Sequence, residues 1–310
     1  MKLPHFESKV FLAPMAGISD PAFRLVCREQ GAGLVFTELT SVHAIVAKEW
    51  EIEKFIPALN KERPVAVQLF GSNLEMLRKA AKIVEPYFDI IDYNMGCPAP
   101  HITEQMAGAA LLQKPELTEK IFSTLVGSVN KPVSVKMRTG VSKADKYKAI
   151  AKIAEDCGVS MMTLHARMLK QGYSGKADWG CIKELKQLVD VPIVGNGDIN
   201  CPEDVLRMFS STGCDYVMIG REAMRNPFIF RQTNDYLKQG EYTKISWAEK
   251  RKLFFKYMRL AKKYEVNFAN IRMQAMNFST GVVGARELRM KIGKCKKEEE
   301  LKNVWDGVIS

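Results

Sequence analysis

The sequence lacks the paired cysteines that mark a disulfide framework or a structural zinc site. Its seven cysteines are an odd number within 310 residues, and no two of them form a CxxC pair. Its four histidines show none of the spacings that hold a metal ion. We therefore expect no metal centre, and we expect reduced cysteines, which are typical of a cytoplasmic protein.

Long hydrophobic segments are also missing. No uninterrupted apolar run approaches the ~20 residues that a membrane-spanning helix requires. The first residues, Met1 to Glu7, lack the apolar core of a secretory signal peptide. A hydrophobic content of 46% is nevertheless typical of a globular fold. The sequence thus favours a globular protein with no membrane partner.

The glycine-rich fingerprint GxGxxG of a Rossmann-type dinucleotide site does not follow the first apolar run. Instead, short apolar runs rich in β-branched residues recur at residues 10–13, 34–38, 65–70, 88–93, 133–137, 160–165, 193–195 and 216–219. Segments with helical spacing lie between them, at residues 22–30, 73–84, 114–129, 143–157, 178–189 and 202–212. Continuous apolar strands that alternate with helices indicate a parallel sheet covered on both faces, and eight repeats predict a (β/α)₈ TIM barrel.

The texture of the chain changes after Arg231. Apolar residues then follow helical spacing only, in segments 246–264, 267–278, 285–292 and 301–308. Lys238-Gln239-Gly240 has the composition of a joint between two parts. We therefore expect a barrel domain over residues 1–239, followed by a small C-terminal helical domain over residues 240–310.

Positive charge is concentrated in the predicted helical domain. Residues 240–310 hold 16 Lys+Arg against 8 Asp+Glu, a net of +8 in a chain whose formal net charge is +11. This excess indicates a polyanionic partner, with nucleic acid the first candidate, while solvated lysine-rich helix faces are the alternative. The candidate contacts to nucleic acid are Lys250, Arg251, Lys262, Lys263, Arg272, Arg286, Arg289 and Lys291.

Polar or small residues follow most of the predicted strands, at the end of a TIM barrel that carries catalytic groups. They are Ala13 to Gly17, Gln68, Asn94 and Cys97, Lys136 and Arg138, His165 and Arg167, Asn196 to Asp198, and Gly220 with Arg221. Alone, Cys97 is more often a small buried hydrophobe than a reactive group. Because buried polar groups are costly unless they are used, the convergence of so many at one rim predicts an active site there.

The loops after the seventh and eighth strands are the usual phosphate site of such barrels. Gly197 and Gly220 let the backbone approach a ligand closely, and Arg221 supplies a charged fork. A cofactor with a single phosphate therefore suits this rim. Lys136 lies part of the way round the barrel, where it can neutralise an anionic ring such as that of a reduced flavin.

A series of short motifs occurs in order along the predicted barrel. They are Ala13-Pro14-Met15-Ala16-Gly17, Gln68-Leu69-Phe70-Gly71, Asn94-Met95-Gly96-Cys97-Pro98, Gly108-Ala109-Ala110-Leu111-Leu112, Val135-Lys136-Met137-Arg138-Thr139-Gly140, His165-Ala166-Arg167, Gly195-Asn196-Gly197-Asp198-Ile199, and Gly220-Arg221 with Asn226-Pro227-Phe228. In this combination the chain resembles the tRNA-dihydrouridine synthase family over residues 10–236. The tail resembles the family in character rather than in motif.

The resemblance implies that FMN lies at the barrel mouth, that NADPH reduces it, and that a uridine in tRNA is the substrate. Cys97 would donate a proton to the uracil, and Asn94, Arg138 and Arg167 would contact the substrate. The implied cofactor residues are Pro14, Met15, Ala16, Gln68, Lys136, His165, Asn196, Gly197, Asp198, Gly220 and Arg221. The target base must leave any stack to reach the mouth, so base flipping is implied as well.

The sequence departs from the family pattern after Cys97. Members often carry a basic pair soon after Cys-Pro, whereas this chain has Ala99-Pro100-His101-Ile102. Two other functions remain open. A small-molecule flavin reductase of the dihydroorotate dehydrogenase type would not need the basic tail, and a non-catalytic RNA-binding barrel would not need Cys97, Gln68 and Lys136 together.

Overall fold

A parallel eight-stranded sheet lies at the centre of the computed structural model, which describes residues 1–47, 61–282 and 284–307. The strands are β1 (Val10–Leu12), β2 (Val35–Ser41), β3 (Val65–Phe70), β4 (Ile90–Met95), β5 (Val133–Arg138), β6 (Met161–His165), β7 (Ile193–Asn196) and β8 (Tyr216–Ile219). They are ordered β1-β8-β7-β6-β5-β4-β3-β2. Backbone hydrogen bonds from Gly33 to Val10 (2.8 Å) and from Leu12 to Leu34 (2.9 Å) bring β1 alongside the start of β2, so the sheet curls into a barrel.

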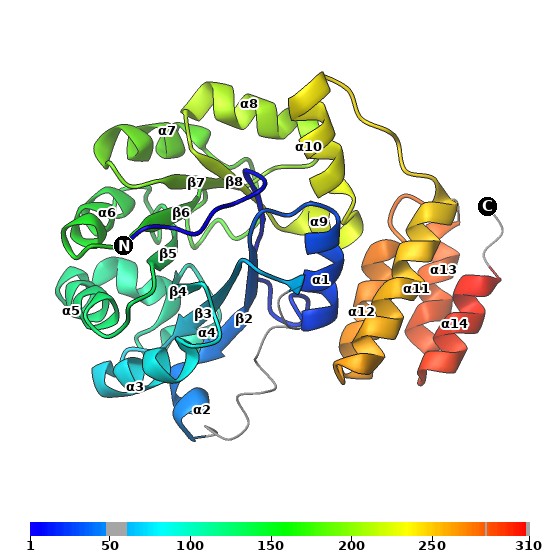
Figure 1. Cartoon of the computed structure of the whole chain (residues 1–310), viewed down its shortest axis with the longest axis horizontal. Helices are drawn as coiled ribbons and strands as arrows, with labels where there is room; N and C mark the ends of the chain where they lie inside the picture. The colour runs from blue at the N-terminus through cyan, green and yellow to red at the C-terminus, as the bar shows by residue number, and fades with distance from the viewer. Residues whose placement is uncertain (48–60, 283, 308–310) are drawn as a thin grey trace.

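Helices connect consecutive strands and cover the outside of the barrel (Figure 1). They are α1 (Pro21–Glu29), α2 (Val42–Ala47), α3 (Leu74–Val84), α4 (Pro100–Thr103), the 3₁₀ helix η3 (Gly108–Gln113), α5 (Pro115–Val126), α6 (Tyr147–Asp156), α7 (Trp179–Leu188), α8 (Pro202–Thr212), α9 (Arg221–Arg225) and α10 (Ile229–Gln239). The expected (β/α)₈ TIM barrel is confirmed. Proline occupies the first turn of α1 and of α8, where its missing N–H costs nothing.

Some boundaries differ from the sequence-based prediction for local reasons. β2 runs to Ser41 rather than to residue 38, because its register against β3 shifts between Phe36 and Leu39. α6 begins at Tyr147 rather than at residue 143, because Lys146 and Tyr147 both donate backbone hydrogen bonds to Thr139 (3.3 Å each). The short helices α2, α4, η3 and α9, and the longer α10, were not predicted at all.

The inside of the barrel changes from apolar to polar along the strands. Near the amino ends it holds a cluster of Phe11, Ala13, Leu34, Phe36, Ala66, Ile90, Met161, Val194 and Met218, which Leu3 and Phe6 cover. Further along, the buried side chains are Gln68, Asp92, Asn94, Ser134, Thr163, His165 and Asn196. This second set lies toward the carboxyl ends of the strands, which is where such barrels carry their chemistry.

The last four helices form a group beside the barrel (Figure 1): α11 (Trp247–Lys263), α12 (Phe268–Phe278), α13 (Ala285–Lys294) and α14 (Glu298–Asp306). α10 ends at Gly240, whose φ of +81° stops the helix, and Ser246 caps α11 in a capping box with Glu249. Aromatic rings fill the core of the group, with centroids 4.2 to 6.2 Å apart, and they come from Phe254, Tyr257, Phe278 and Trp305.

This helical group packs against the barrel through α1 and the loop before it (Figure 1). The Tyr257 hydroxyl donates a hydrogen bond of 3.0 Å to the Asp20 carboxylate at the start of α1. A Cβ on Gly17, in the loop after β1, would lie 3.0 Å from the Met273 side chain of α12. α12 therefore borders the barrel mouth at the segment predicted to frame the flavin.

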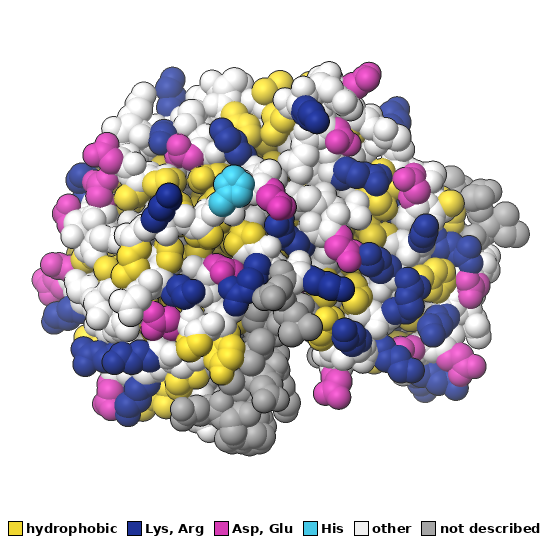
Figure 2. Space-filling view, viewed as in Figure 1, with side chains coloured by type: hydrophobic (Ala, Val, Ile, Leu, Met, Phe, Trp, Pro, Cys, Tyr) yellow, Lys and Arg dark blue, Asp and Glu magenta, His cyan; other side chains and the backbone are white. Residues whose placement is uncertain are grey.

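Basic side chains are prominent on the surface of the helical group. Figure 2 shows Lys and Arg side chains spread over the helical group on the face that carries the N-terminal segment. Within the described residues, no helix combines the length and the hydropathy that crossing a bilayer requires.

Candidate active site

A cavity opens at the carboxyl ends of β1, β5, β6, β7 and β8. Many of the residues predicted to bind a cofactor line it: Pro14, Met15, Lys136, His165, Asn196, Gly197, Asp198, Gly220 and Arg221. Ala16 is exposed beside it, and Gln68 is buried deeper in the barrel. The structure thus brings together residues that lie as far apart in the sequence as β1 and β8.

The Cys97 thiol lies in the loop that follows β4 at the carboxyl end of the barrel. The Asn94 side-chain oxygen accepts hydrogen bonds from the backbone N–H groups of Gly96 (3.2 Å) and Cys97 (2.9 Å). On the other side, the Ala109 N–H donates to the Cys97 carbonyl (3.1 Å). Gly108 has a φ of +59°, and a Cβ there would lie 2.8 Å from that carbonyl, so only glycine fits. Cys97 itself is half-buried.

A chain of hydrogen bonds leads from this loop into the barrel. The Asn94 amide nitrogen donates to the Gln68 side-chain oxygen (2.7 Å), and the Gln68 amide nitrogen donates to the Asp92 carboxylate (2.7 Å). The Ser134 hydroxyl donates to the other oxygen of Asp92 (2.5 Å). Burial raises the pKa of Asp92 to about 6, although Gln68, Ser134 and Lys136 act to lower it. The carboxylate is therefore mostly ionised at neutral pH.

Lys136 and His165 face the cavity with shifted pKa values. Burial lowers the pKa of Lys136 to about 8, and Arg138 acts in the same direction, while Asp92 and Cys97 oppose the shift. Burial also lowers the pKa of His165 to about 2, and Lys136 and the three nearby arginines add to this effect. At neutral pH the mouth thus presents a largely protonated lysine and a neutral imidazole.

Asp198 organises the side of the cavity formed by β7 and β8. It has a φ of +55°, and its carboxylate accepts hydrogen bonds from Arg167 (2.6 and 2.8 Å), the Ala177 N–H (2.7 Å) and Arg221 (3.1 Å). Burial acts to raise the pKa of Asp198, but the Ala177 N–H and the two arginines outweigh it and hold the pKa below its usual value. Arg221 stays partly exposed and faces the cavity, so this corner keeps one cation available for an anionic ligand.

Arg167 and Arg138, both predicted to contact a substrate, are almost fully buried and bonded to the protein. Arg167 is 2% exposed and reaches Asp198 and the Gly175 carbonyl (2.7 Å). Arg138 is 3% exposed and donates to the carbonyls of Gly96 (3.1 Å), Met168 (3.0 Å) and Gly172 (3.2 Å). Arg138 thereby ties the Cys97 loop to the loop after β6. Contact of either arginine with a substrate stays a prediction.

Tyr173 is a residue of the mouth that the sequence analysis missed. It is 63% exposed, lines the cavity, and lies between the guanidinium groups of Arg221 (4.9 Å from its ring centroid) and Arg138 (5.8 Å). Its ring centroid is 6.2 Å from that of His165. The available signal was the length of the connection between β6 and α7, since long loops of a compact domain are usually functional.

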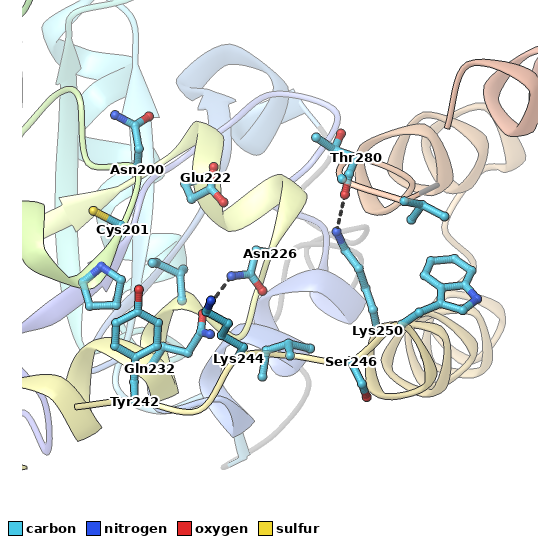
Figure 3. A pocket seen from close by; sticks show the side chains of 16 residues that line it. Asn200, Cys201, Glu222, Asn226, Gln232, Tyr242, Lys244, Ser246, Lys250 and Thr280 are labelled. Atoms are coloured by element: carbon cyan, nitrogen blue, oxygen red, sulfur yellow. Dashed lines mark hydrogen bonds between the residues drawn. The ribbon is translucent and has the colours of Figure 1, made fainter. Parts of the chain in front are cut away.

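A larger cavity, of about 500 Å³, lies between the barrel and the helical group (Figure 3). Its described lining contains none of the residues predicted to bind the cofactor or the uridine, although it includes Lys250, a predicted contact to nucleic acid. Lys250 is held there by a hydrogen bond to the Thr280 carbonyl (2.6 Å), and burial lowers its pKa to about 8. Burial raises the pKa of Cys201 in the wall to about 11, so this thiol is protonated and unreactive at neutral pH. The chemistry therefore favours the smaller cavity at the mouth.

Metal ligation does not compete with this arrangement. Among the residues whose placement is described, no three His, Cys, Asp or Glu side chains come together in a way that could hold a metal ion. The cysteines among the described residues are not linked by disulfides. A (β/α)₈ barrel that gathers a lysine, an imidazole and an arginine at its mouth, beside a loop with a half-buried thiol, has the architecture of barrel enzymes, which carry their chemistry at the carboxyl ends of the strands.

Comparison with known proteins gives the family. The family model described as "Dihydrouridine synthase (Dus)" matches residues 11–309, so the chain belongs to the dihydrouridine synthase family. The chain is 42% identical over 230 residues to tRNA-dihydrouridine synthase B of Pasteurella multocida, covering 73% of this chain and 68% of that one. It is 35% identical over 303 residues to a probable tRNA-dihydrouridine synthase of Aquifex aeolicus, covering 95% and 94%.

Solved structures with the same fold are more distant in sequence. Histamine dehydrogenase from Rhizobium sp. 4-9 superimposes with a TM-score of 0.61 at 15% identity, covering 83% of this chain and 50% of that one. An old yellow enzyme homologue from Zymomonas mobilis gives a TM-score of 0.56 at 14% identity, covering 78% and 92%. At this identity the likeness concerns the fold alone.

Proposed function

We propose that this protein reduces uridines in tRNA to 5,6-dihydrouridine, using FMN that NADPH re-reduces. The observation that carries the proposal is the placement of Cys97. In a chain that belongs to the dihydrouridine synthase family, the loop after β4 carries this half-buried thiol near enough to Lys136 and Arg138 for its charge to act on their pKa values, although Cys97 is not among the residues that line the cavity. A thiol in that position is suited to deliver a proton to a base that enters the mouth.

The residues at the mouth fit a flavin with a single phosphate. Arg221 suits the phosphate through its charge, and Gly197 and Gly220 suit it because no side chain covers their backbone. Gly197 has no room for a side chain, since a Cβ there would lie 2.8 Å from the Ala177 side chain. Lys136 would suit the anionic edge of the ring, and His165 would lie beside it. Pro14, Met15 and Ala16 would frame the ring, Gln68 would meet its polar edge, and Asn196 and Asp198 would complete the ribityl and phosphate site. When bound, the flavin supplies the hydride for C6 of the uracil.

The chain's own groups account for the remaining proton. The Cys97 thiol would donate its proton to C5, on which negative charge develops. Asn94 holds the Cys97 loop through its side-chain oxygen, and its predicted contact with the uracil stays a prediction. The thiolate left behind is stabilised by nearby cations, since its charge acts on the pKa values of both Lys136 and Arg138. Arg138 and Arg167 would hold the substrate side of the mouth, and the neutral His165 adds no charge that would repel either arginine.

A small-molecule pyrimidine oxidoreductase of the dihydroorotate dehydrogenase type is the second candidate, because it would use the same barrel and a related thiol. The net charge of +8 in residues 240–310 favours the tRNA reaction. The relatives named above, which the chain matches over most of its length, are tRNA enzymes by name.

The two half-reactions test the role of Cys97 separately. In Cys97→Ala, we expect NADPH to reduce the bound flavin at the wild-type rate, because that step needs no proton from the thiol. We expect reoxidation of the flavin by tRNA to slow by roughly 10²- to 10⁴-fold, which is typical for loss of a general acid. Stopped-flow absorbance of the flavin measures both rates.

Cys157→Ala is the matched control, since Cys157 is also half-buried but lies at the end of α6. It should behave as the wild type in both half-reactions. Wild-type reoxidation by tRNA in Cys97→Ala would remove Cys97 from the proposed chemistry.

A further inference from the structure

Asp92 is a fully buried carboxylate for which the reaction above has no direct use. It lies in β4, two residues before Asn94, and is 0% exposed. Its two oxygens accept hydrogen bonds from Gln68 and Ser134, and Lys136 of the neighbouring strand is the cation whose charge acts on it. Burying a charge costs free energy that a neutral residue would avoid, so a carboxylate here calls for a reason.

The reason lies in what a carboxylate can and cannot do. An ionised carboxylate only accepts hydrogen bonds, whereas a side-chain amide can present either its oxygen or its nitrogen. Facing Asp92, Gln68 must therefore present its nitrogen, which turns its oxygen toward Asn94. Asn94 must then present its nitrogen to Gln68. This leaves the Asn94 oxygen facing the N–H groups of Gly96 and Cys97.

The direction of the whole chain is thus constrained at both ends, by Asp92 inside the barrel and by two N–H donors in the Cys97 loop. If both amides were reversed, the Asn94 nitrogen would face two N–H donors, and the Gly96 and Cys97 hydrogen bonds would not form. A neutral amide in place of Asp92 accepts either direction, because it can itself present an oxygen or a nitrogen to Gln68. The acceptor-only carboxylate at the buried end and the donor-only N–H groups at the loop end thus select the same arrangement, and Asp92 supplies the buried half of that selection.

We infer that Asp92 is a positioning residue that fixes the orientation of the Gln68 and Asn94 amides and thereby holds the Cys97 loop in its place on the rim. The chemical purpose of that placement rests on the proposed function, but the placement itself does not. Asp92 acts through the side chains of Gln68 and Asn94, and it is too deeply buried to contact a substrate. Its effect therefore belongs to the thiol's position rather than to any bond that is made or broken.

The test uses the reactivity of the Cys97 thiol, which needs neither flavin nor tRNA. Alkylation of Cys97 by iodoacetamide is followed by peptide mass spectrometry, and Cys157 in the same molecules serves as the internal reference. In Asp92→Asn, we expect the ratio of the Cys97 rate to the Cys157 rate to rise about tenfold, because the loop loses a charge-oriented hydrogen bond. Gln68→Met cuts the chain between Asp92 and Asn94 and should give the same rise.

Ser134→Ala is the matched control. It removes the other hydrogen bond to Asp92 but leaves the chain toward Cys97 intact, so the rate ratio should stay within about twofold of the wild type. An unchanged ratio in folded Asp92→Asn or Gln68→Met would overturn the inference, as would an equal rise in Ser134→Ala.

A second readout links the inference to catalysis in the flavin-loaded enzyme. Asp92→Asn should slow flavin reoxidation by tRNA about tenfold while leaving reduction by NADPH unchanged, and Ser134→Ala should leave both rates unchanged. A wild-type enzyme that does not react with tRNA would refute the proposed function, whereas the alkylation ratio would still decide the role of Asp92. Normal reoxidation in Asp92→Asn, together with wild-type activity on tRNA, would contradict the inference alone.

Discussion

Lys136 is the residue whose surroundings say most about how the mouth handles charge. It is largely protonated at neutral pH even though burial lowers its pKa to about 8, because Asp92 and Cys97 partly offset that effect. In the proposed reaction, negative charge appears on the reduced flavin and on the Cys97 thiolate. A lysine near both groups would stabilise both charges without moving, which is the way in which preorganised charges contribute to catalysis.

Replacing this lysine should change the flavin itself. In Lys136→Met, the anionic reduced ring loses its nearby cation, so we expect a more negative reduction potential and turnover that is slower by roughly 10²-fold. Equilibration with a reference dye measures the potential. Lys183→Met removes an exposed lysine of α7 and should leave the potential unchanged. Equal potentials in Lys136→Met and the wild type would make Lys136 an ordinary charge of the rim.

Which residues of the site could be predicted from the sequence depended on where their partners lie. Cys97, Lys136 and His165 were found because each stands at the end of an apolar run, a position that has meaning in a barrel. Asp92 was not, because its partners Gln68 and Ser134 lie 24 and 42 residues away and come near only when β3, β4 and β5 pair. Tyr173 was missed because its loop carries no periodicity that fixes where its side chain points.

At the scale of elements, the start of α1 joins the barrel to the helical group. Asp20 caps α1 by accepting the Phe23 N–H (2.9 Å), and its other oxygen accepts the Tyr257 hydroxyl of α11 (3.0 Å). Burial raises the pKa of Asp20 to about 6, although both hydrogen bonds and Arg24 act to lower it. The Asp20 carboxylate thus caps the N-terminus of α1, bonds to α11, and carries a charge that becomes buried on folding.

This raised pKa predicts a specific pH dependence of stability. Because the folded protein binds the Asp20 proton more tightly than the unfolded chain does, Asp20 favours folding below about pH 4 and loses that contribution as pH rises to 6. A shift of about two pKa units corresponds to roughly 3 kcal/mol. At pH 4.5, which is above the ordinary pKa of 3.8, part of this contribution is already lost. Relative to wild type, Asp20→Asn should therefore be more stable at pH 7.5 than at pH 4.5 by roughly 2 kcal/mol, as measured by urea unfolding.

The control for Asp20→Asn is an exposed aspartate. Asp156→Asn, on the surface of α6, keeps the same change of chemistry without the burial, and its stability relative to wild type should barely depend on pH. Parallel pH profiles for the wild type and Asp20→Asn would show that the carboxylate is not buried as the structure has it.

Elements were predictable where one physical signal dominated. Buried strands were placed to within a few residues, as were α1, α5 and α8, which have proline in their first turn; α4 also begins with proline but was not predicted. α10 was not predicted, because the segment 229–239 was taken as the start of the change in texture that leads to the helical tail. The extra length of β2 depends on a register shift against β3, and such a shift is a property of two strands rather than of one.

At the scale of the whole molecule, the helical group stands beside the barrel mouth through α12 and carries much of the net charge. Of the eight basic residues predicted to contact nucleic acid, Lys250, Arg251 and Arg272 are bonded to Thr280, Asp306 and Cys295 respectively. Arg286 and Arg289 of α13 are exposed, with no hydrogen bond or ion pair inside the described part of the chain. Together with Lys262 and Lys263 of α11, which share these properties among the described residues, this arginine pair supplies the better candidates for RNA phosphates.

Reversing the charge of this pair should weaken tRNA binding in a salt-dependent way. In Arg286→Glu/Arg289→Glu, we expect lower affinity at low salt and a salt slope that falls by about one for each phosphate that the variant no longer neutralises. Stability should change by about half a kcal/mol or less, because both side chains are exposed. Fluorescence anisotropy of labelled tRNA, measured at several salt concentrations, gives both the affinity and the slope.

A matched pair on the opposite side of the barrel controls for net charge. Lys82→Glu/Lys120→Glu makes the same four-unit change on exposed residues of α3 and α5, far from the helical group (Figure 1). Its salt slope should stay close to that of the wild type. Equal reductions of affinity in the two double variants would mean that only net charge matters, and an unchanged affinity in the α13 pair would exclude it from the RNA-binding surface.

The central claim is most directly tested by the product. Purified protein loaded with FMN is incubated with NADPH and tRNA that lacks dihydrouridine, and a parallel sample receives free uridine and orotate instead. Dihydropyrimidines are then measured by mass spectrometry, with their positions mapped in the tRNA. We expect dihydrouridine at one or a few positions of the tRNA and no reduction of the free pyrimidines. Reduction of free pyrimidines without any dihydrouridine in tRNA would contradict the account and favour the small-molecule oxidoreductase.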